Sequence, residues 1–303
     1  MIPDLSTDRI TEELLKAVSG GDCIAWVGSG LSAVAYRGWT DAIAELCDAC
    51  GIPRLVGTYP KAEELIDKAE ECKNSDQHAY EMTLANLYGG NVVVTRQAYL
   101  WLMKAPFKAY VTTNFDPLLS ESAAVAGHTH VFHYPLLETP EIGRRTKPIF
   151  YIHGHARPNG VASGQDLVLA RSEFKQAYGG IVSLFLQAIL LSYPIVFIGC
   201  RLSEPEIQEQ MSRVHSMLVQ IKNSRAGYKS PVRFALLAPI IVGGDRKVDQ
   251  ELVEAERFQD LDTTVLRYSP ADPAKHWEIE DILKSLCDAT PVVGASGPGI
   301  VSP

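Results

Sequence analysis

The sequence lacks both a hydrophobic leader and paired cysteine clusters. Its first nine residues, MIPDLSTDR, are polar and acidic, which is not the pattern of a secretory signal. The 6 cysteines among 303 residues form no disulfide framework, and free thiols are typical of a reducing compartment. The apolar run at 181–200 is interrupted by polar residues and by Pro194, so it predicts a buried helix and strand and not a membrane span. We therefore expect a cytoplasmic protein without a membrane segment.

An excess of basic residues is also missing. The chain has 28 Lys and Arg residues against 36 Asp and Glu residues, a formal net charge of −8. Binding along a nucleic-acid backbone needs clustered Lys and Arg to release counterions, so direct nucleic-acid binding is not expected as the main activity. Hydrophobic residues make up 46% of the chain and charged residues 21%, which excludes a wholly disordered polymer and leaves ample chain for a core.

What the sequence does contain is an alternation of apolar strands and helices. Strand patterns occur at 23–28, 109–112, 130–134, 148–153, 167–170, 194–199, 232–238 and 263–267. Helical patterns occur at 8–19, 172–192, 204–221, 249–258 and 273–289, and the segment 33–105 is mainly helical. Strands that are apolar throughout are typical of parallel sheets covered on both faces. We predict an α/β fold with a Rossmann-like, mostly parallel sheet, helices on both faces and a helical insertion after the first strand. A single domain is expected over 1–290, with a flexible tail at 291–303.

The first candidate site is the turn GSGLS at 28–32, which directly follows an apolar strand. A glycine turn lets backbone N–H groups approach a pyrophosphate, a helix N-terminus after it favours the same negative charge, and Ser32 can add a hydroxyl. An ordinary strand-to-helix turn explains the two glycines equally well. The third glycine of the dehydrogenase fingerprint is missing, because Ala33 follows, so a standard dehydrogenase is not expected.

A second candidate is the segment YVTTNFDP at 110–117. Its polar residues Thr112, Thr113, Asn114 and Asp116 lie where a strand ends, which in doubly wound folds faces the ligand crevice. The amide of Asn114 offers both a donor and an acceptor, enough to orient a ribose hydroxyl or a water molecule. The alternative is a turn in which Asp116 caps the following helix.

The third candidate is His153, at the end of the buried strand predicted over 148–153. A histidine can accept a proton near neutral pH, and Gly154 leaves room for a substrate close to the backbone. His153 and His155 also have the spacing of two metal ligands on a strand. No carboxylate-rich ligand set accompanies them, so no metal is expected.

A fourth candidate follows the strand at 194–199. Gly199, Arg201 and Ser203 could bind an adenosine ribose or a phosphate, although Arg201 could equally pair with Glu204 or Glu206. Cys200 is more simply a buried thiol than a nucleophile, since nothing near it indicates activation. All four candidates follow apolar strands, and in a parallel sheet such strand ends converge on one crevice.

Taken in order, GSGLS at 28–32, TTNFD at 112–116, IHG at 152–154 and IGCRLSEP at 198–205 resemble the motifs of sirtuin-like (SIR2-like) proteins. The resemblance runs from about residue 20 to 210. It is especially similar to bacterial SIR2-like domains of antiphage defence systems, down to LVLA at 167–170. In that family such domains degrade NAD. The resemblance implies a Rossmann-like sheet with a helical module after the first strand.

The chain departs from the deacetylase sirtuins in its cysteines. Those enzymes hold a structural zinc ion with two Cys-x-x-Cys pairs, whereas the only such spacing here is Cys47 to Cys50, within a helical pattern. Four thiolate ligands cannot be assembled from one pair. The zinc module is therefore predicted to be absent, which favours NAD hydrolysis over NAD-dependent deacylation.

The resemblance also implies roles for individual residues. Asn114 would hold the ribose hydroxyls or the attacking water, His153 would act as general base, and Asp116 would orient this network or stabilise positive charge. The NAD-binding residues implied are Gly28, Ser29, Gly30 and Ser32 at the pyrophosphate, Thr112 and Thr113 beside them, and Gly199, Arg201 and Ser203 at the adenosine end. A zinc-free deacylase and a non-catalytic sensor of NAD or an ADP-ribose-type nucleotide remain as alternatives.

Uncontrolled NAD destruction would kill the host, so a defence role implies activation by assembly or by a partner. We expect a homo-oligomer and a separate sensor or activator protein, with an ATPase or an Argonaute-like protein suggested by the family. Apolar residues of the helical insertion could form the oligomer interface or belong to the core. They are Leu84, Leu87, Tyr88, Tyr99, Leu100 and Trp101.

Overall fold

In the part of the chain that the structure describes, seven parallel strands form the central sheet. The computed structural model describes residues 7–33, 35–56, 60–90, 97–139, 141–237, 258, 262–267 and 277–288. The strands are β1 (Ile24–Val27), β2 (Ala109–Thr112), β3 (Val131–His133), β4 (Ile149–Tyr151), β5 (Ile195–Ile198), β6 (Arg233–Leu237) and β7 (Thr263–Arg267). They pair in the order β3-β4-β2-β1-β5-β6-β7, and every described pair is parallel. The predicted Rossmann-like α/β fold is therefore confirmed.

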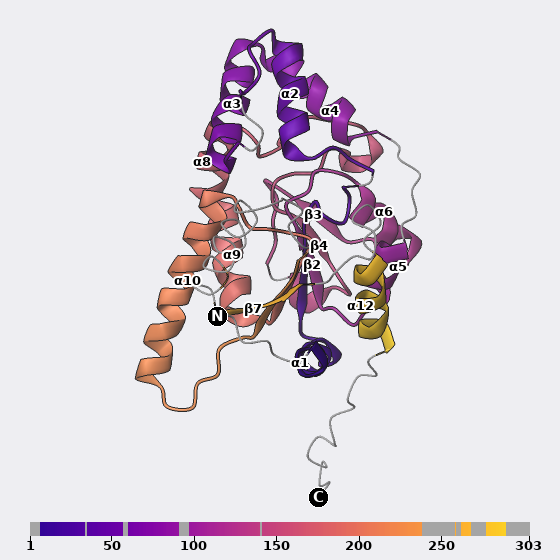
Figure 1. Cartoon of the computed structure of the whole chain (residues 1–303), viewed down its shortest axis with the longest axis vertical. Helices are drawn as coiled ribbons and strands as arrows, with labels where there is room; N and C mark the ends of the chain where they lie inside the picture. Colours follow the sequence, from indigo (N-terminus) through magenta and orange to yellow (C-terminus); the bar gives the residue numbers. More distant parts are fainter. Residues whose placement is uncertain are drawn as a thin grey trace, which may run out of the picture.

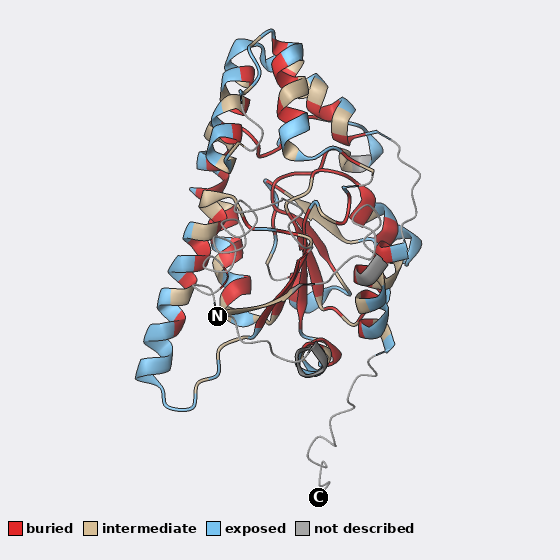
Figure 2. Ribbon diagram, viewed as in Figure 1, coloured by how far each residue is buried: buried red, intermediate tan, exposed pale blue. Residues whose placement is uncertain are grey.

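Sequence composition explains why the inner strands are buried on both faces. The segments IAWV, AYVT, IFY and IVFI of β1, β2, β4 and β5 consist mainly of branched and aromatic residues, and all of their residues are buried (Figure 2). Successive side chains of a strand point to opposite faces. Trp26 accordingly packs with Phe197 on one face, whereas Ala25 and Val27 belong to the core on the other.

Helices cover both faces of the sheet (Figure 1). One face packs against α1 (Thr7–Ser19), α5 (Gln97–Lys104), α6 (Leu118–Val125) and α12 (Trp277–Asp288). The opposite face packs against α8 (Arg171–Tyr178), α9 (Ile181–Ser192) and α10 (Pro205–Ser224). The short helix α7 (Glu141–Arg144) precedes β4.

A helical lobe lies beyond the carboxyl edge of the sheet, at the top of Figure 1. It consists of α2 (Trp39–Cys50), α3 (Ala62–Ser75) and α4 (Gln77–Tyr88), and α2 packs against both of the others. Together with α5, these helices lie between β1 and β2 in the sequence, as the expected helical insertion requires. The order of the strands changes direction at β1, which pairs with β2 on one side and β5 on the other. In doubly wound folds such a switch point opens a crevice at the carboxyl ends of the strands.

Two predicted elements differ from the structure, and two others lie outside the described residues. Residues 167–170 form an extended loop and not a strand. The single helix expected over 172–192 is two helices, α8 and α9, which meet at 57° because Gly179 and Gly180 interrupt them. The helix expected at 249–258 and the tail at 291–303 lie outside the described residues, apart from Phe258.

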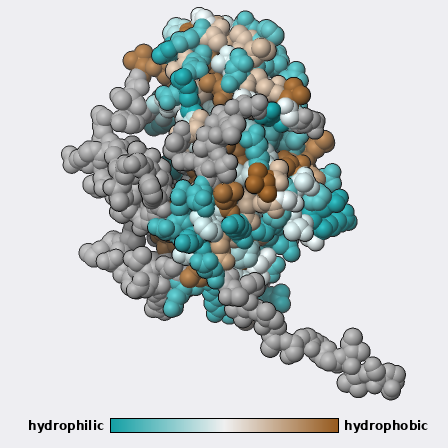
Figure 3. Space-filling view, turned by 90° about the vertical axis from the view of Figure 1, so that its right-hand side faces the viewer, coloured by the Kyte–Doolittle hydropathy of each residue, from teal (hydrophilic) through white to brown (hydrophobic). Residues whose placement is uncertain are grey.

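The apolar residues of the insertion belong to the core. Leu84, Tyr88 and Tyr99 are buried, and Leu87 and Trp101 are partly buried against the same core. These five residues therefore pack within the protein, whereas Leu100 is half-buried and is not among the residues of that core. On the face shown in Figure 3, hydrophobic residues occur in small groups among hydrophilic ones.

The cysteines are free thiols. Cys47 and Cys72 approach each other, with 3.9 Å between their Sγ atoms, and both are buried. Within the described part of the chain, no group of three or more His, Cys, Asp or Glu residues is arranged to hold a metal ion. In the same part, no single helix has both the length and the apolar character of a membrane span, which only the bent pair α8 and α9 reaches when taken together.

Candidate active site

A pocket opens at the carboxyl ends of β1, β2 and β4, beside the switch point at β1. It is bounded by the turn after β1, the segment 113–116 after β2, His153 after β4, and parts of α2, α4, α8 and the loop before α10. Seven of the predicted site residues line it: Ser29, Gly30, Ser32, Thr113, Asn114, Asp116 and His153. Segments far apart in the sequence therefore converge on one cavity.

The glycines of the turn after β1 are required by a close approach to β5. The N–H groups of Gly28 and Gly30 donate to the carbonyls of Ile198 and Gly199, both at 2.9 Å. A Cβ atom on Gly30 would lie 2.7 Å from the Gly199 carbonyl oxygen, and one on Gly28 would overlap the side chain of Cys200. These two N–H groups are thus used within the fold, so the turn offers the pocket mainly its serine hydroxyls.

A helix N-terminus reaches the pocket ten residues after the first glycine of the turn, and not directly behind the turn as the sequence suggested. Gly38 is the N-cap of α2 and has no side chain to bind the free N–H groups of the first turn. Gly38, Trp39 and Arg37 line the pocket. The positive end of the α2 dipole therefore faces the cavity and favours a negatively charged group there.

Ser32 and Asn114 form a hydrogen-bonded pair at the floor of the pocket. The Nδ2 atom of Asn114 donates to Oγ of Ser32 at 3.2 Å, and the Asn114 backbone N–H donates to Oγ1 of Thr112 at 3.0 Å. The Thr112 hydroxyl in turn donates to the carbonyl of Val27 at 2.7 Å. Thr112 is completely buried and does not line the cavity, so it fixes the segment after β2 against β1.

Asp116 is buried beside this pair and carries a perturbed carboxyl group. Its Oδ1 atom accepts the backbone N–H of Leu118 at 3.2 Å, which holds the turn before α6; the N-cap of that helix is Pro117, so the expected cap by Asp116 is not found. Burial raises the pKa of Asp116 to about 6, against the opposing effect of a hydrogen bond with Ser32. The hydrogen bond to Leu118 alone does not require the Asp116 carboxyl group to be buried. Asp116 therefore combines a local structural role with a carboxyl group that titrates close to neutral pH.

His153 lies on the opposite side of the pocket, buried under α8. Its Nε2 atom is 2.7 Å from the hydroxyl of Tyr178, and its ring meets Phe174 edge to face at 5.1 Å between ring centroids. Burial lowers the pKa of His153 to about 3, so the imidazole is neutral at pH 7. The His153 carbonyl accepts the N–H of Val168 at 2.8 Å, which holds the pocket-lining loop against the end of β4.

His155 is bound differently from His153. Its Nδ1 atom accepts the backbone N–H of Arg157 at 2.9 Å, so the ring proton lies on Nε2, which is 2.9 Å from the hydroxyl of Ser120. The Ser120 hydroxyl donates to the carbonyl of Pro117 at 2.9 Å. A histidine that donates to a serine cannot deprotonate it, so this pair is structural and not a nucleophilic dyad.

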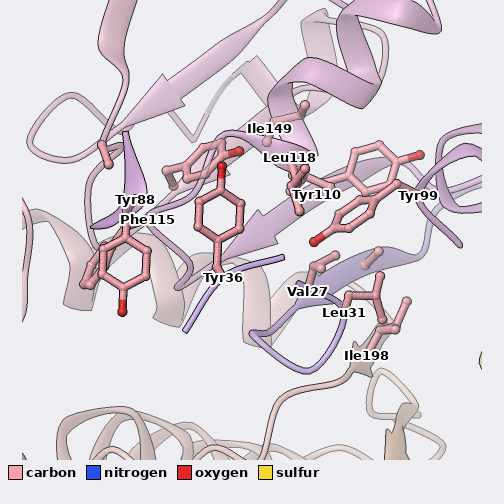
Figure 4. Close-up of a cluster of buried hydrophobic side chains, with 14 of the residues drawn as sticks. Val27, Leu31, Tyr36, Tyr88, Tyr99, Tyr110, Phe115, Leu118, Ile149 and Ile198 are labelled. Carbon is pink, nitrogen blue, oxygen red and sulfur yellow. The ribbon is translucent and has the colours of Figure 1, made fainter. Parts of the chain in front are cut away.

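An aromatic wall that the sequence did not reveal, formed by Tyr36, Tyr88 and Phe115, lines one side of the pocket; Figure 4 shows these three side chains within the buried cluster that they belong to. Tyr36 stacks on Tyr88 at 6.3 Å between ring centroids, and Tyr88 meets Phe115 edge to face at 5.3 Å. Trp39 and Phe174 also line the cavity. Flat rings of this kind can stack on a planar heterocycle. Nothing in the spacing of these aromatics distinguishes them from core residues, and only the fold brings them together.

Five of the predicted site residues do not line this cavity. Gly28, Thr112, Gly199, Arg201 and Ser203 are not among the residues that line it, whereas Glu204 is, and the sequence analysis did not select Glu204. Cys200 is buried, its thiol lies 3.5 Å from the carbonyl of Trp26, and burial raises its pKa well above the ordinary value. The thiol is therefore un-ionised at neutral pH, which agrees with a packing role.

Glu173 anchors the loop that carries the pocket residues Val168 and Leu169. Its Oε2 atom accepts the N–H groups of Leu169 at 2.9 Å and Ala170 at 2.7 Å, and also the hydroxyl of Tyr80 at 3.0 Å. Its Oε1 atom pairs with Lys73 at 2.9 Å. One carboxylate thus binds the pocket wall to α3 and α4 of the helical lobe.

The sequence of the chain is similar to those of known proteins. Residues 108–258 match the family profile described as "SIR2-like domain". The chain is 23% identical over 228 residues to a protein named "NAD(+) hydrolase ThsA" from Cytobacillus dafuensis, which covers 71% of this chain and 43% of that protein. It is 21% identical over 283 residues to a protein of the same name from Enterococcus faecium, covering 89% and 56%. The chain spans about half the length of these curated relatives.

Proposed function

Residues 108–258 of the chain are a SIR2-like domain, and we propose that the protein hydrolyses NAD at the bond between nicotinamide and ribose C1′. The observation that supports this most strongly is the convergence of Asn114, Asp116 and His153 on one pocket beside an aromatic wall. The names of the two relatives describe the same activity. The products would be nicotinamide and ADP-ribose.

The reaction itself sets modest demands on the protein. Nicotinamide leaves as a neutral molecule with the electron pair of the C–N bond, so no acid is needed at its departure. The ribose develops positive charge at C1′, as in glycoside hydrolysis, and water then forms the new C–O bond and releases one proton. A catalyst must therefore stabilise a cation, place a water molecule and accept that proton.

Three side chains of the pocket suit these tasks. Above its pKa of about 6, the Asp116 carboxylate places a negative charge in a buried site, where it stabilises the developing ribose cation. Asn114 uses its amide, already oriented by Ser32, to hold a ribose hydroxyl or the water. His153 is neutral at pH 7, so its imidazole has a lone pair that can accept the proton.

The two ends of the pocket suit the rest of the substrate. The hydroxyls of Ser29 and Ser32, Thr113 and the start of α2 would bind the pyrophosphate, with Gly30 beside them in the lining of the pocket. The aromatic wall would stack on the nicotinamide ring. At the adenosine end we retain Arg201 and Ser203 as binding residues, outside the cavity, and assign Gly28, Thr112 and Gly199 an indirect role through the backbone of the turn.

We further propose that this activity serves antiphage defence by NAD depletion in the cytoplasm, in a homo-oligomer controlled by a separate sensor protein. The basis is the resemblance of the motifs at 28–32, 112–116, 152–154 and 198–205 to those of antiphage defence proteins. A sensor, whether an ATPase or an Argonaute-like protein, would recognise the invading nucleic acid that this acidic chain is not suited to bind.

Incubation of the purified chain with NAD, alone and with candidate partners, tests the proposal when the products are identified by chromatography and mass spectrometry. Equal amounts of nicotinamide and ADP-ribose are expected. Product that forms only when an acyl-lysine peptide is added, together with O-acyl-ADP-ribose, would show a deacylase instead. Saturable binding with intact NAD under all conditions would show a sensor.

A further inference from the structure

The hydroxyl of Tyr178 is the only group among the described residues that hydrogen-bonds the His153 ring. The two atoms are 2.7 Å apart, Tyr178 is on α8, and its ring stacks on Phe174 at 5.8 Å between centroids. Since Nε2 is occupied by this contact, Nδ1 is the ring nitrogen that remains for a ligand in the pocket. Which nitrogen carries the proton of the neutral imidazole then depends on whether Tyr178 donates or accepts.

The surroundings of Tyr178 favour acceptance. Tyr178 also lines a second cavity, between α8, α9 and α10, and shares that cavity with Glu206. Burial first, and then the negative charges of Glu204 and Glu206, raise the pKa of Tyr178 well above its ordinary value, so the phenol stays protonated. The Glu206 carboxylate pairs with Arg171 through Oε1 at 3.3 Å, and its Oε2 atom is buried without a hydrogen-bond partner among the described residues. A hydroxyl dipole in this field turns its hydrogen toward the carboxylates and its lone pairs toward His153.

We propose that Tyr178 is a positioning residue, which accepts the Nε2–H of His153 and so keeps the Nδ1 lone pair directed to the pocket. This inference rests on the proposed function, because it explains how a buried, neutral histidine can serve as the base. When Nδ1 takes up the proton released by water, the Nε2–H bond to Tyr178 stabilises the resulting imidazolium ion. Tyr178 itself exchanges no proton and touches no substrate.

The alternative arrangement has a different chemical outcome. If Tyr178 donated to Nε2, the ring proton would lie on Nδ1, and His153 could only donate a hydrogen bond into the pocket. His155 shows instead that the fold can fix a ring in the Nε2–H form, since its Nδ1 accepts a backbone N–H and its Nε2 is left protonated. The two histidines are two residues apart and would share the Nε2–H tautomer, one through a backbone donor and the other through a phenol acceptor.

The tautomer can be measured without any turnover. Two-bond 1H–15N NMR spectra of histidine-labelled protein distinguish the two neutral tautomers, and a His153→Gln sample identifies the signal of His153. The wild-type protein is expected to show the Nε2–H form. The Nδ1–H form in wild-type protein would overturn the proposal.

Tyr178→Phe removes only the hydroxyl and keeps the ring stacked on Phe174. It is expected to shift the tautomer balance of His153 and to lower kcat for NAD hydrolysis roughly 10- to 100-fold with little change in KM, because a bond to the charged imidazolium is lost. Tyr110→Phe is the matched control. The Tyr110 hydroxyl is also buried, but it donates to the carbonyl of Leu102 at 3.0 Å and makes no hydrogen bond with His153. The control should leave the tautomer and kcat unchanged.

The outcomes separate this inference from the proposed function. A Tyr178→Phe protein with the wild-type tautomer and wild-type kcat overturns the inference while NAD hydrolysis stands. A wild-type chain that leaves NAD intact under every condition overturns the proposed function, and the NMR measurement still decides whether Tyr178 controls the His153 tautomer.

Discussion

The carboxyl edge of the sheet has two halves that end differently. After β2 and β4, the side chains of Asn114, Asp116 and His153 line the pocket. After β1 and β5, the backbone of Gly28 and Gly30 packs directly on that of Gly199, and their N–H groups bind across the gap. The first half presents side chains to the pocket, whereas in the second half the glycine backbones close the fold while Ser29, Ser32 and Glu204 line the same pocket. Glycine after a strand can therefore mark a close contact between strands as readily as a phosphate-binding turn.

The largest expected effect is on catalysis, and it concerns the side chains after β2 and β4, which we call the chemical half of the edge; the glycine contacts after β1 and β5 are the closed half. His153→Ala and Asn114→Ala should each lower the rate of ADP-ribose formation by about 100-fold or more, the usual range for loss of acid–base catalysis. Circular dichroism should show that both variants stay folded. The matched control is His155→Asn, which keeps an acceptor for the Arg157 N–H and changes a residue outside the pocket. Full hydrolysis by both alanine variants would falsify the assignment.

A second prediction concerns the closed half. Gly28→Ala should lower the free energy of unfolding by about 1–3 kcal/mol, because its new methyl group overlaps Cys200 and lies 2.7 Å from the Gly199 carbonyl. Urea denaturation measures this change. Gly143→Ala is the control, since a Cβ atom there meets nothing within 4 Å. Unchanged stability with a raised KM for NAD would instead make Gly28 a ligand-binding residue.

The third prediction uses the buried carboxyl group of the chemical half. The pKa of Asp116 is about 6 when folded and about 3.9 in an unfolded chain, so folding buries a charge above pH 6 and takes up a proton between pH 6 and 4. Asp116→Asn removes the charge and should raise the free energy of unfolding by about 2–3 kcal/mol above pH 6. The difference from wild-type protein should shrink as the pH falls and vanish near pH 4.

In the wild-type and the Asp116→Asn proteins alike, His153 changes the pH dependence of the free energy of unfolding with the opposite sign. Its folded pKa of about 3 lies below the unfolded value of about 6.5, so its contribution to stability is lost as the pH falls through this interval. Comparison of the two proteins cancels that contribution. Urea titrations at several pH values between 4 and 7.5 provide the measurement. A difference that does not vary with pH would show that Asp116 keeps an ordinary pKa.

The smallest expected effect concerns the residues after β5. Arg201→Ala should raise KM for NAD by about two- to tenfold and leave kcat unchanged, as for loss of one exposed hydrogen bond to the substrate. Arg201 is exposed and lies outside the cavity. Steady-state kinetics at saturating and limiting NAD distinguish the two parameters. An unchanged KM would leave the β5 end with a structural role only.

Local sequence patterns were sufficient for most of the sheet and for half of the site. Runs such as IAWV and IVFI are apolar throughout, a pattern that predicts a strand buried on both faces. Asn114 and His153 follow such strands directly, so the prediction that they share a crevice needed only the rule for parallel sheets. The break between α8 and α9 could also have been inferred, since Gly179 and Gly180 are visible in the sequence.

The remainder depends on contacts between distant segments. Tyr178 lies 25 residues beyond His153, and the aromatic wall joins Tyr36 with Tyr88, so no local spacing identifies them. Residues 167–170 have the composition of a strand but are held as a loop by bonds to Glu173 and to the His153 carbonyl. Tertiary hydrogen bonds there replace those that a sheet would have supplied.

Glu173 has a consequence for how this family can diverge. Its carboxylate receives donors from Lys73, Tyr80 and the loop that holds Leu169, so a change at any of these positions alters the surroundings of the others. Substitutions at 73, 80 and 173 are therefore expected to occur together across related sequences. We therefore expect the helical lobe and the wall of the pocket to vary together, and a lobe grafted from a relative to be accepted only with its matching partner at position 173.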